Sequence, residues 1–451
     1  MPGIDLASRV HDHNYAIDPY VRSLLDTDFY KLLMAAYVQK WHPDVHVTFT
    51  LKIRSKGVRL ADIIREEDLR AQLDHVRSLR FTNTELIWLA GASFYGQVGI
   101  FSPEFIAELR DFRLPDYSLT RDETGEFRLS FSGRWGEVKF WEIYGLAIVN
   151  EARARAGMRD MSKYQLRVLY ANATSKLVGK LKALRDAGVP RISEFGTRRR
   201  HGFLWQEFVI EAMGEELGGN FAGTSNALQA MRLGIEAVGT NAHELPMVAS
   251  GLARIRAMNG EGTLAENIFR SQYDVLERWQ QTFRGNLLVA LPDTFGTTQF
   301  LKNAPEHFPA IADWRGFRLD SKDPAIGAEE IIRFWQGIGE DPKGKLMLFS
   351  DGLDVDGMID LHARFGDRCM DAYGWGTLAT NDFRGCDPRG GTALDPISVV
   401  CKVTEIMTRD GAVSAVKLSD SYEKATGEPN AIALYRDIFG TEGVANIPVT
   451  V

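Results

Sequence analysis

At residues 239–247 the sequence reads Gly-Thr-Asn-Ala-His-Glu-Leu-Pro-Met. A short apolar run precedes this stretch at 235–238 and a helical pattern follows it, so we expect His243 where a strand ends and a helix begins. Backbone N–H groups at a helix start attract anions, and a neutral imidazole there is a competent nucleophile toward a phosphoryl group. A lone histidine is commonly a capping or core residue, so the surrounding sequence must decide.

Short strand patterns alternate with helix patterns on both sides of this stretch. Such alternation is typical of parallel βαβ units, and seven or eight strands favour a closed or nearly closed barrel over an open sheet. We therefore predict an α/β catalytic domain over residues 151–400 that forms an irregular or incomplete (β/α) barrel. The expected strands are 191–195, 220–223, 235–239, 286–292, 316–320, 346–350, 369–373 and 413–418, and the expected helices between most of them are 203–216, 225–233, 244–257, 265–283, 325–336 and 354–364.

The first 150 residues show a different pattern. A helix is expected through about Gln39, and residues 60–112 have the pattern of further helices. Apolar and polar residues alternate at 45–51 and again at 127–131, with a further apolar segment at 138–140, which is typical of strands. We predict a smaller α+β domain with an antiparallel sheet over 1–150, beginning with an unstructured arm at 1–20, and the segment of about 400–451 has room to pack back on it.

The composition limits the classes of function. At 451 residues the chain exceeds one ordinary domain, and its 45% hydrophobic and 25% charged residues are typical of a soluble enzyme. A net charge of −7 argues against a nucleic-acid partner, which would need a broad basic face. We expect no signal peptide and no membrane partner, because the apolar runs are too short. Three cysteines without CxxC spacing suit a reducing cytosol, so we expect a cytoplasmic protein.

Glycine, hydroxyl or charged residues follow each expected strand. In a (β/α) barrel these strand ends share the face that holds the active site. Several of the ends contain Gly-Thr pairs, which predicts an anion site built from backbone N–H groups. The segments are 194–198, 223–225, 239–243, 293–297, 318–321, 350–352, 374–377 and 417–420.

Three of these segments carry candidate phosphate or ribose ligands. Gly374-Trp375-Gly376-Thr377 is the best phosphate cradle, because glycine lets the backbone approach an anion and Thr377 can donate its hydroxyl, although a tight turn without a ligand is the alternative. Asp351 can accept two ribose hydroxyls. Arg198, the first of three consecutive arginines, is a candidate phosphate or pyrophosphate clamp, although such runs are usually solvated surface.

Other strand ends carry charged residues with a possible catalytic role. Arg318 offers the planar fork that suits a carboxylate. Asp293 and Asp320 are candidates for holding Mg²⁺ through water or for stabilising positive charge on a ribosyl carbon, and the alternative for either one is a helix cap. His243-Glu244 begins an HExxH pattern, but Met247 stands at the second histidine position, so a zinc pair is excluded.

Seven motifs together resemble the nicotinate phosphoribosyltransferase family. They occur in order from about residue 22 to residue 420, which is nearly the whole chain. One departure is Lys322, where the family commonly has glycine. The motifs are LLDTDFYK at 24–31, EFGTRR at 194–199, GTSN at 223–226, GTNAHE at 239–244, RLDS at 318–321, SDGLD at 350–354 and GWGT at 374–377.

The resemblance implies a reaction of NAD biosynthesis. Nicotinate and 5-phosphoribosyl-1-pyrophosphate would give nicotinate mononucleotide and pyrophosphate, with Mg²⁺ present and ATP hydrolysed as a co-substrate. It implies that ATP phosphorylates His243. It also implies a split α/β barrel with a smaller sheet domain, and a homodimer whose active sites lie at the subunit interface.

The resemblance also implies roles for the candidate residues. Phe195 and the Tyr30 of the partner subunit would stack the pyridine ring between them. Arg318 would pair with the nicotinate carboxylate, and Ser225 would lie near the same group. The other implied positions are Arg198 at the pyrophosphate, Asp320 and Asp351 at the ribose, Gly376 and Thr377 at the 5′-phosphate, and Asp293 as a catalytic residue near Mg²⁺.

Nicotinamide phosphoribosyltransferase is the main alternative. In that relative the position matching Ser225 is an aspartate, which would accept from a carboxamide but repel a carboxylate, so Ser225 favours nicotinate. A quinolinate enzyme would need a denser cationic cluster and no His243. A protein that only binds a nucleotide would not need Asp293, Arg318 and Asp320 beside that histidine. Without the resemblance, a barrel enzyme of unrelated sugar-phosphate chemistry also fits the residues.

Overall fold

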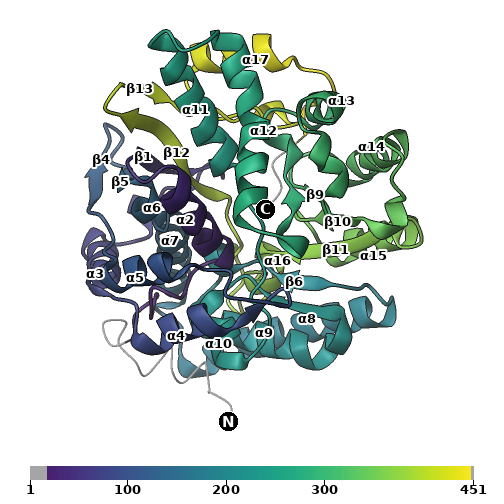
Figure 1. Ribbon diagram of the computed structural model, residues 1–451. Helices are drawn as coiled ribbons and strands as arrows, with labels where there is room; N and C mark the ends of the chain where they lie inside the picture. The colour runs from purple at the N-terminus through teal and green to yellow at the C-terminus, as the bar shows by residue number, and fades with distance from the viewer. Residues whose placement is uncertain (1–17, 448–451) are drawn as a thin grey trace.

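The computed structural model describes residues 18–447. Most of the predicted arm at 1–20 therefore lies outside the described residues. Two sheets organise the chain, and Figure 1 shows them side by side. The antiparallel sheet joins purple and blue N-terminal strands to two yellow-green strands from the C-terminal part, and the parallel sheet is made of teal and green strands. In the described part of the chain, none of the helices is both long and apolar enough to cross a membrane.

The antiparallel sheet has the strand order β13-β12-β1-β5-β4. Its central strand β1 alternates buried and more exposed residues, with Val47 and Phe49 fully buried, because one face of the sheet packs on helices and the other does not. The strands are β1 (His46–Ile53), β4 (Tyr117–Arg121), β5 (Phe127–Arg134), β12 (Val399–Thr408) and β13 (Gly411–Ser414), and a separate hairpin joins β2 (Ser93–Phe94) to β3 (Gln97–Val98).

Within residues 18–447, seven α-helices accompany this sheet or lead away from it. The expected strand at 138–140 is wrong, because residues 135–138 form a short helix and a long helix begins at Trp141. That long helix is buried on nearly all sides, so it has no polar face. Its sequence therefore lacks the alternation of polar and apolar faces by which a surface helix is predicted. The helices are α2 (Phe29–Trp41), α3 (Glu66–Ser78), α4 (Asn83–Gly91), α5 (Pro103–Asp111), α6 (Trp135–Val138), α7 (Trp141–Met158) and α8 (Lys163–Asp186).

The parallel sheet has six strands in the order β7-β6-β11-β10-β9-β8. Its strands are β6 (Ile192–Glu194), β7 (Phe221–Thr224), β8 (Val289–Ala290), β9 (Gly316–Leu319), β10 (Leu346–Phe349) and β11 (Met370–Trp375). The helices in and after it are α9 (Phe203–Leu217), α10 (Ala227–Leu233), α11 (Glu244–Met258), α12 (Leu264–Thr282), α13 (Thr297–His307), α14 (Pro324–Gly337), α15 (Val355–Phe365), α16 (Thr377–Thr380) and α17 (Pro429–Phe439).

The barrel is incomplete, as predicted. Within residues 18–447, β7 and β8 form the two free edges of the sheet and do not pair. Two expected strands are corrected. The segment 235–239 makes only a single bridge, between Ala237 and Thr224. The strand expected at 413–418 is β13 at 411–414, and it belongs to the antiparallel sheet because a tight turn pairs it with β12.

The C-terminal third of the chain returns to the N-terminal sheet. Strand β12 pairs antiparallel with β1 along its length, from Ile53 opposite Val399 to His46 opposite Met407. Helix α11 packs against both α12 and β12. The return of β12 places residues around 400 and 417 opposite the carboxyl ends of the parallel strands, and the main pocket lies between them.

Candidate functional site

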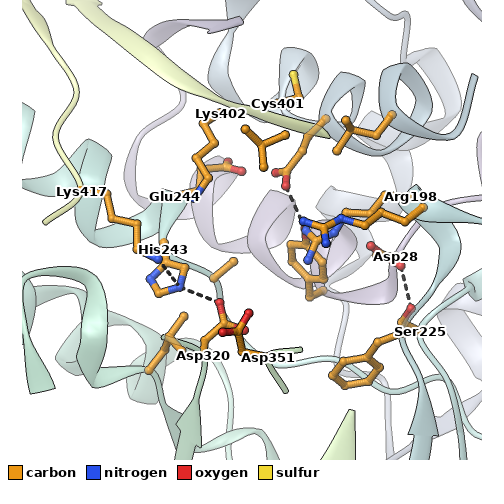
Figure 2. Close-up of a pocket in the computed structure, with 18 of the residues that line it drawn as sticks. Asp28, Arg198, Ser225, His243, Glu244, Asp320, Asp351, Cys401, Lys402 and Lys417 are labelled. Atoms are coloured by element: carbon orange, nitrogen blue, oxygen red, sulfur yellow. Dashed lines mark hydrogen bonds and ion pairs between the residues drawn. The ribbon is translucent and has the colours of Figure 1, made fainter. Parts of the chain in front are cut away.

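One pocket combines both sheets, and most of the predicted site residues line it (Figure 2). Its walls come from α2, the first turn of α7, the ends of the parallel strands, the start of α11, and β12. Of the predicted residues, it is lined by Tyr30, Phe195, Arg198, Ser225, His243, Arg318, Asp320 and Asp351.

His243 stands directly before α11, as the sequence pattern predicts. Its Nε2 lies 3.0 Å from Asp320 Oδ2 and 3.1 Å from Lys417 Nζ, and its Nδ1 lies 3.0 Å from Thr294 Oγ1. Burial, with help from the Lys417 ammonium, lowers the pKa of His243 to about 4, although Asp293 and Asp320 oppose the shift. The imidazole is therefore neutral near pH 7, which is the form that can act as a nucleophile.

Asp320 connects His243 to Arg318. Its Oδ1 accepts from Arg318 Nη2 at 2.8 Å and from Ser350 Oγ at 2.9 Å. Burial alone would raise the pKa of Asp320, but Arg318 and the hydrogen bond from His243 outweigh it and hold the pKa well below its ordinary value. A fixed carboxylate at this position can stabilise positive charge that develops nearby.

Phe195 lies on the pocket wall beside Arg318. The Arg318 guanidinium carbon lies 5.9 Å from the centre of the Phe195 ring. Gly374 makes room for this ring, because a Cβ built there would come within 2.4 Å of Phe195 Cδ2. The predicted glycine motif therefore has a packing role for Phe195 that the sequence alone did not indicate.

Ser225 has a carboxylate partner that the sequence argument missed. Its hydroxyl donates to Asp28 Oδ1 at 2.6 Å, and Asp28 also lines the pocket (Figure 2). Burial raises the pKa of Asp28, although Arg198 and the Ser225 hydrogen bond oppose the shift. The reasoning from Ser225 alone was therefore incomplete, because an acidic residue from α2's leading turn lies within hydrogen-bond distance of it. The LLDTDFYK motif contains this residue, but its sequence does not reveal the contact.

The three consecutive arginines separate into different environments. Arg200 is fully buried and forms two hydrogen bonds with Asp26, at 2.7 and 2.9 Å, so this part of the run is structural rather than solvated surface. Arg198 lines the pocket and donates from Nη1 to Glu142 Oε1 at 3.0 Å. Arg199 lines the pocket too and points toward Thr377, with Nη1 3.4 Å from Thr377 Oγ1.

Three predicted residues lie just outside the pocket lining. Gly376 and Thr377 come at the end of β11, where Arg199 reaches Thr377. Asp293 lies behind His243, with Oδ2 3.7 Å from Nε2 of the imidazole. These residues lie next to residues of the pocket lining, but none of the three lines the pocket itself.

A cluster of cations on the wall opposite the parallel strands was not predicted. Lys402 lies on β12, Lys417 comes after β13, and Arg54 comes directly after β1. Lys424 donates to Asp351 Oδ2. Burial, with the neighbouring Lys417 and Arg54, lowers the pKa of Lys402 far below its ordinary value, and an anion among these side chains would relieve that cost.

One imidazole and two carboxylates lie close enough together to suggest a cation site. One ligand atom from each of His243, Asp293 and Asp320 lies within 4.8 Å of the others. Oδ1 of Asp293 is buried and, among the described residues, has no hydrogen-bond partner. Carboxylate oxygens are the ligands that Mg²⁺ prefers, so Asp293 and Asp320 fit this ion better than the imidazole does.

Tyr30 lines the pocket of its own chain, and the expectation that the partner subunit supplies this residue stays a prediction. Its hydroxyl accepts from Arg198 Nη1 at 3.0 Å. Tyr30 and Phe195 therefore line one pocket within one chain.

The architecture is similar to that of solved structures described as nicotinate phosphoribosyltransferases. Solved structures described by that name match with TM-scores of 0.79 for Porphyromonas gingivalis, at 25% identity over 93% of this chain and 100% of the other, and 0.80 for Vibrio cholerae, at 28% identity over 95% and 96%. A structure described as a putative nicotinate phosphoribosyltransferase from Saccharomyces cerevisiae matches with a TM-score of 0.78, at 27% identity over 94% and 99%.

Sequence models of one family match both parts of the chain. The nicotinate phosphoribosyltransferase (NAPRTase) N-terminal domain matches residues 25–150, and the nicotinate phosphoribosyltransferase (NAPRTase) family matches residues 190–443. Because these matches span most of the chain and contain every residue that lines the pocket, the chain belongs to the nicotinate phosphoribosyltransferase family.

Proposed function

We propose that this nicotinate phosphoribosyltransferase couples its reaction to ATP by phosphorylating His243. The enzyme transfers 5-phosphoribosyl from phosphoribosyl pyrophosphate to nicotinate, giving nicotinate mononucleotide and pyrophosphate for NAD biosynthesis. The single observation that carries the proposal of ATP coupling is His243 itself, a neutral imidazole that lines the same pocket as the four lysine or arginine side chains of the unpredicted cation cluster. The four are Arg54, Lys402, Lys417 and Lys424.

The base is proposed to bind between Phe195 and Tyr30, with its carboxylate at Arg318. The Phe195 ring offers a flat apolar face, and the neighbouring Arg318 guanidinium offers the charge. Arg318 Nε and Nη2 already donate to Ser350 and Asp320, while Nη1 has only a 3.4 Å contact with Thr240, so Nη1 is the group left for the ligand. Ser225 also lines the pocket and is proposed to contact the same carboxylate.

The ribose and phosphates are proposed to lie across the pocket. Asp320 and Asp351 would hold the ribose and stabilise the positive charge of an oxocarbenium-like transition state. Arg198 would meet the pyrophosphate, and Gly376 and Thr377 would lie at the 5′-phosphate, where the contact from Arg199 to Thr377 brings a cation. The four opposing cations are proposed to bind the remaining phosphate oxygens.

ATP coupling would follow from charge. A phosphoryl group on His243 would add negative charge near Asp293 and Asp320, which favours binding of Mg²⁺ together with the departing pyrophosphate. Asp293, whose buried Oδ1 has no hydrogen-bond partner within residues 18–447, and Asp320 would hold Mg²⁺, which when bound neutralises charge on the phosphate oxygens. Lys417, 3.1 Å from His243 Nε2, would keep the imidazole unprotonated before phosphorylation.

A paired assay tests the proposal. Purified enzyme receives phosphoribosyl pyrophosphate, Mg²⁺ and either nicotinate or nicotinamide, each with and without ATP, and mononucleotide is measured. We expect nicotinate to be used, ATP to accelerate the reaction, and the gain from ATP to vanish in His243→Ala. His46→Ala, an exposed histidine on β1, is the matched control and should keep the gain.

The opposite results separate the parts of the proposal. The comparisons do not favour nicotinamide, so better use of nicotinamide than of nicotinate would contradict the roles given to Arg318 and Ser225. An undiminished gain from ATP in His243→Ala would remove the phosphohistidine from the proposal while leaving the transfer reaction intact.

Two further expectations are carried forward as predictions. The homodimer implied by the resemblance, with active sites shared between the subunits, is tested by sedimentation. Cytoplasmic localisation, suggested by the three cysteines without paired spacing, is tested by cell fractionation.

A further inference from the structure

A chain of charged side chains runs along the pocket from the first turn of α11 to Arg198. Glu244 follows His243 and accepts from Lys31 Nζ at Oε2, and the same Nζ donates to Glu142 Oε2 at 2.6 Å. Glu142 uses its other oxygen, Oε1, to accept from Arg198 Nη1 at 3.0 Å. The first turn of α11 is therefore linked to the arginine proposed to meet the pyrophosphate.

The ion pair between Lys31 and Glu142 is largely buried, and this fixes the charge of both groups. The Lys31 side chain is 0% exposed and that of Glu142 is 15% exposed. Burial alone would lower the pKa of Lys31, but Glu142 and Glu244 hold it above its ordinary value. Burial alone would likewise raise the pKa of Glu142, but Lys31 and Arg198 hold it below. Glu142 is therefore a fixed carboxylate, because its two oxygens have cationic partners on opposite sides.

The carboxylate fixes one side of Arg198 and leaves the other side available. Arg198 Nη1 donates both to Glu142 and to the Tyr30 hydroxyl, at 3.0 Å each. Between residues 18 and 447, no hydrogen-bond acceptor is found for its Nε or Nη2, and the side chain lines the pocket. Two contacts on one nitrogen set the direction of the guanidinium plane, so its remaining N–H groups point in a defined direction.

If the pocket only had to attract phosphate, the carboxylate of Glu142 beside Arg198 would be unfavourable. Glu142 also lines the pocket, and a negative charge there weakens the attraction of the pocket for phosphate. Its place beside Arg198 is better explained by orientation, because an arginine held in one rotamer loses less conformational entropy when an anion binds.

We propose that Glu142 is a positioning residue for phosphoribosyl transfer, which holds Arg198 in the orientation that meets the pyrophosphate while Lys31 fixes Glu142 from behind. This inference rests on the proposed function, because it takes the pyrophosphate as the group that Arg198 binds. Glu142 belongs to the N-terminal part of the chain, so this part would also help to orient a substrate-binding residue.

A double-mutant cycle on the full-length enzyme tests this role. Glu142→Gln keeps the size of the side chain but replaces one acceptor oxygen with an N–H₂ group. We expect kcat/KM for phosphoribosyl pyrophosphate to fall about 10- to 100-fold, as for other misplaced groups near reacting atoms. In an Arg198→Ala background the same change should cost less than about 2-fold, because the group that Glu142 orients is already gone.

Control variants separate positioning from general damage. Glu137→Gln on α6 removes a carboxylate that pairs with Arg134 outside the pocket, and should change kcat/KM less than about 2-fold. If thermal melting shows that Glu142→Gln is unfolded, Glu142→Asp replaces it, since it keeps the charge for Lys31 and shortens the reach to Arg198. The same non-additivity with Arg198→Ala is expected for Glu142→Asp.

Titration calorimetry with inorganic pyrophosphate and Mg²⁺ keeps this inference separate from the proposed function. Failure of the wild-type enzyme to make mononucleotide would contradict the function, whereas the cycle can still be measured on the Kd for pyrophosphate. There, Glu142→Gln should raise Kd in the wild-type background and leave it unchanged in the Arg198→Ala background. Equal losses in the two backgrounds, in kcat/KM or in Kd, would overturn the positioning role.

Discussion

Arg318→Gln is expected to lower the preference for nicotinate over nicotinamide by about 10- to 150-fold. The magnitude follows from the contacts of the guanidinium. Nε donates to Ser350 Oγ and Nη2 donates to Asp320 Oδ1, each at 2.8 Å, which leaves Nη1 for the nicotinate carboxylate. One hydrogen bond to a charged group contributes about 1.5–3 kcal/mol, and each 1.4 kcal/mol corresponds to about tenfold.

The assay is a competition between the two bases for a limiting amount of phosphoribosyl pyrophosphate. Loss of Arg318 also removes the cation that holds the pKa of Asp320 low, and this slows the reaction with either base. The ratio of the two products cancels that common effect, because both bases react in the same pocket. Arg315→Gln is the matched control, because Arg315 directly precedes β9, the strand that contains Arg318, and its Nη1 donates to the Gly344 carbonyl.

The reasoning would be refuted by a product ratio that changes less than about threefold while both rates fall. That result would mean that Arg318 acts through Asp320 alone and that another group recognises the carboxylate. Asp28 and Ser225, which also line the pocket, would then be the residues to examine.

Three further predictions concern stability, shape and pH. Arg200→Met should lower the free energy of unfolding by about 3–5 kcal/mol, because it leaves the Asp26 carboxylate buried without its main partner; an unchanged denaturant midpoint would contradict this. Gly374→Ala should raise KM for nicotinate about tenfold with little change in melting temperature, because the new methyl group displaces the Phe195 ring; an unchanged KM would contradict the packing role. Labelling of His243 by γ-labelled ATP should stay constant from about pH 8 to about pH 5.5 and decline only toward pH 4, because the lowered pKa keeps the imidazole neutral over that range, whereas a half-maximal point near pH 6.5 would show an unperturbed histidine.

Local patterns in the sequence were sufficient to predict the residues that follow parallel strands. Phe195, Ser225 and Asp320 each come directly after a short buried strand, and such strand ends meet at one edge of a sheet. The helix that begins after His243 was also predictable, although the strand expected before it makes only a single bridge. These residues depend mainly on their own neighbours in the chain.

The cations opposite them could not be predicted from local patterns. Lys402 lies on β12 and Arg54 follows β1, and these two strands meet only because distant segments pair. The strand predicted at 413–418 was assigned to the wrong sheet because its alternation does not say which partner it takes. The contact of Asp28 with Ser225 could not be predicted for the same reason. It depends on a β-bridge between Asp28 and Asn226, which joins segments far apart in sequence.

The pairing of β1 with β12 also has a consequence for how the protein is made. During synthesis, β1 and β5 exist long before residues 399–408 leave the ribosome, so one side of β1 presents unpaired N–H and C=O groups for most of that time. An exposed strand edge of this kind is where a nascent chain joins the wrong partner. We expect production of the intact enzyme to depend on chaperones that cover this edge, and fragments that end before β12 to aggregate rather than fold.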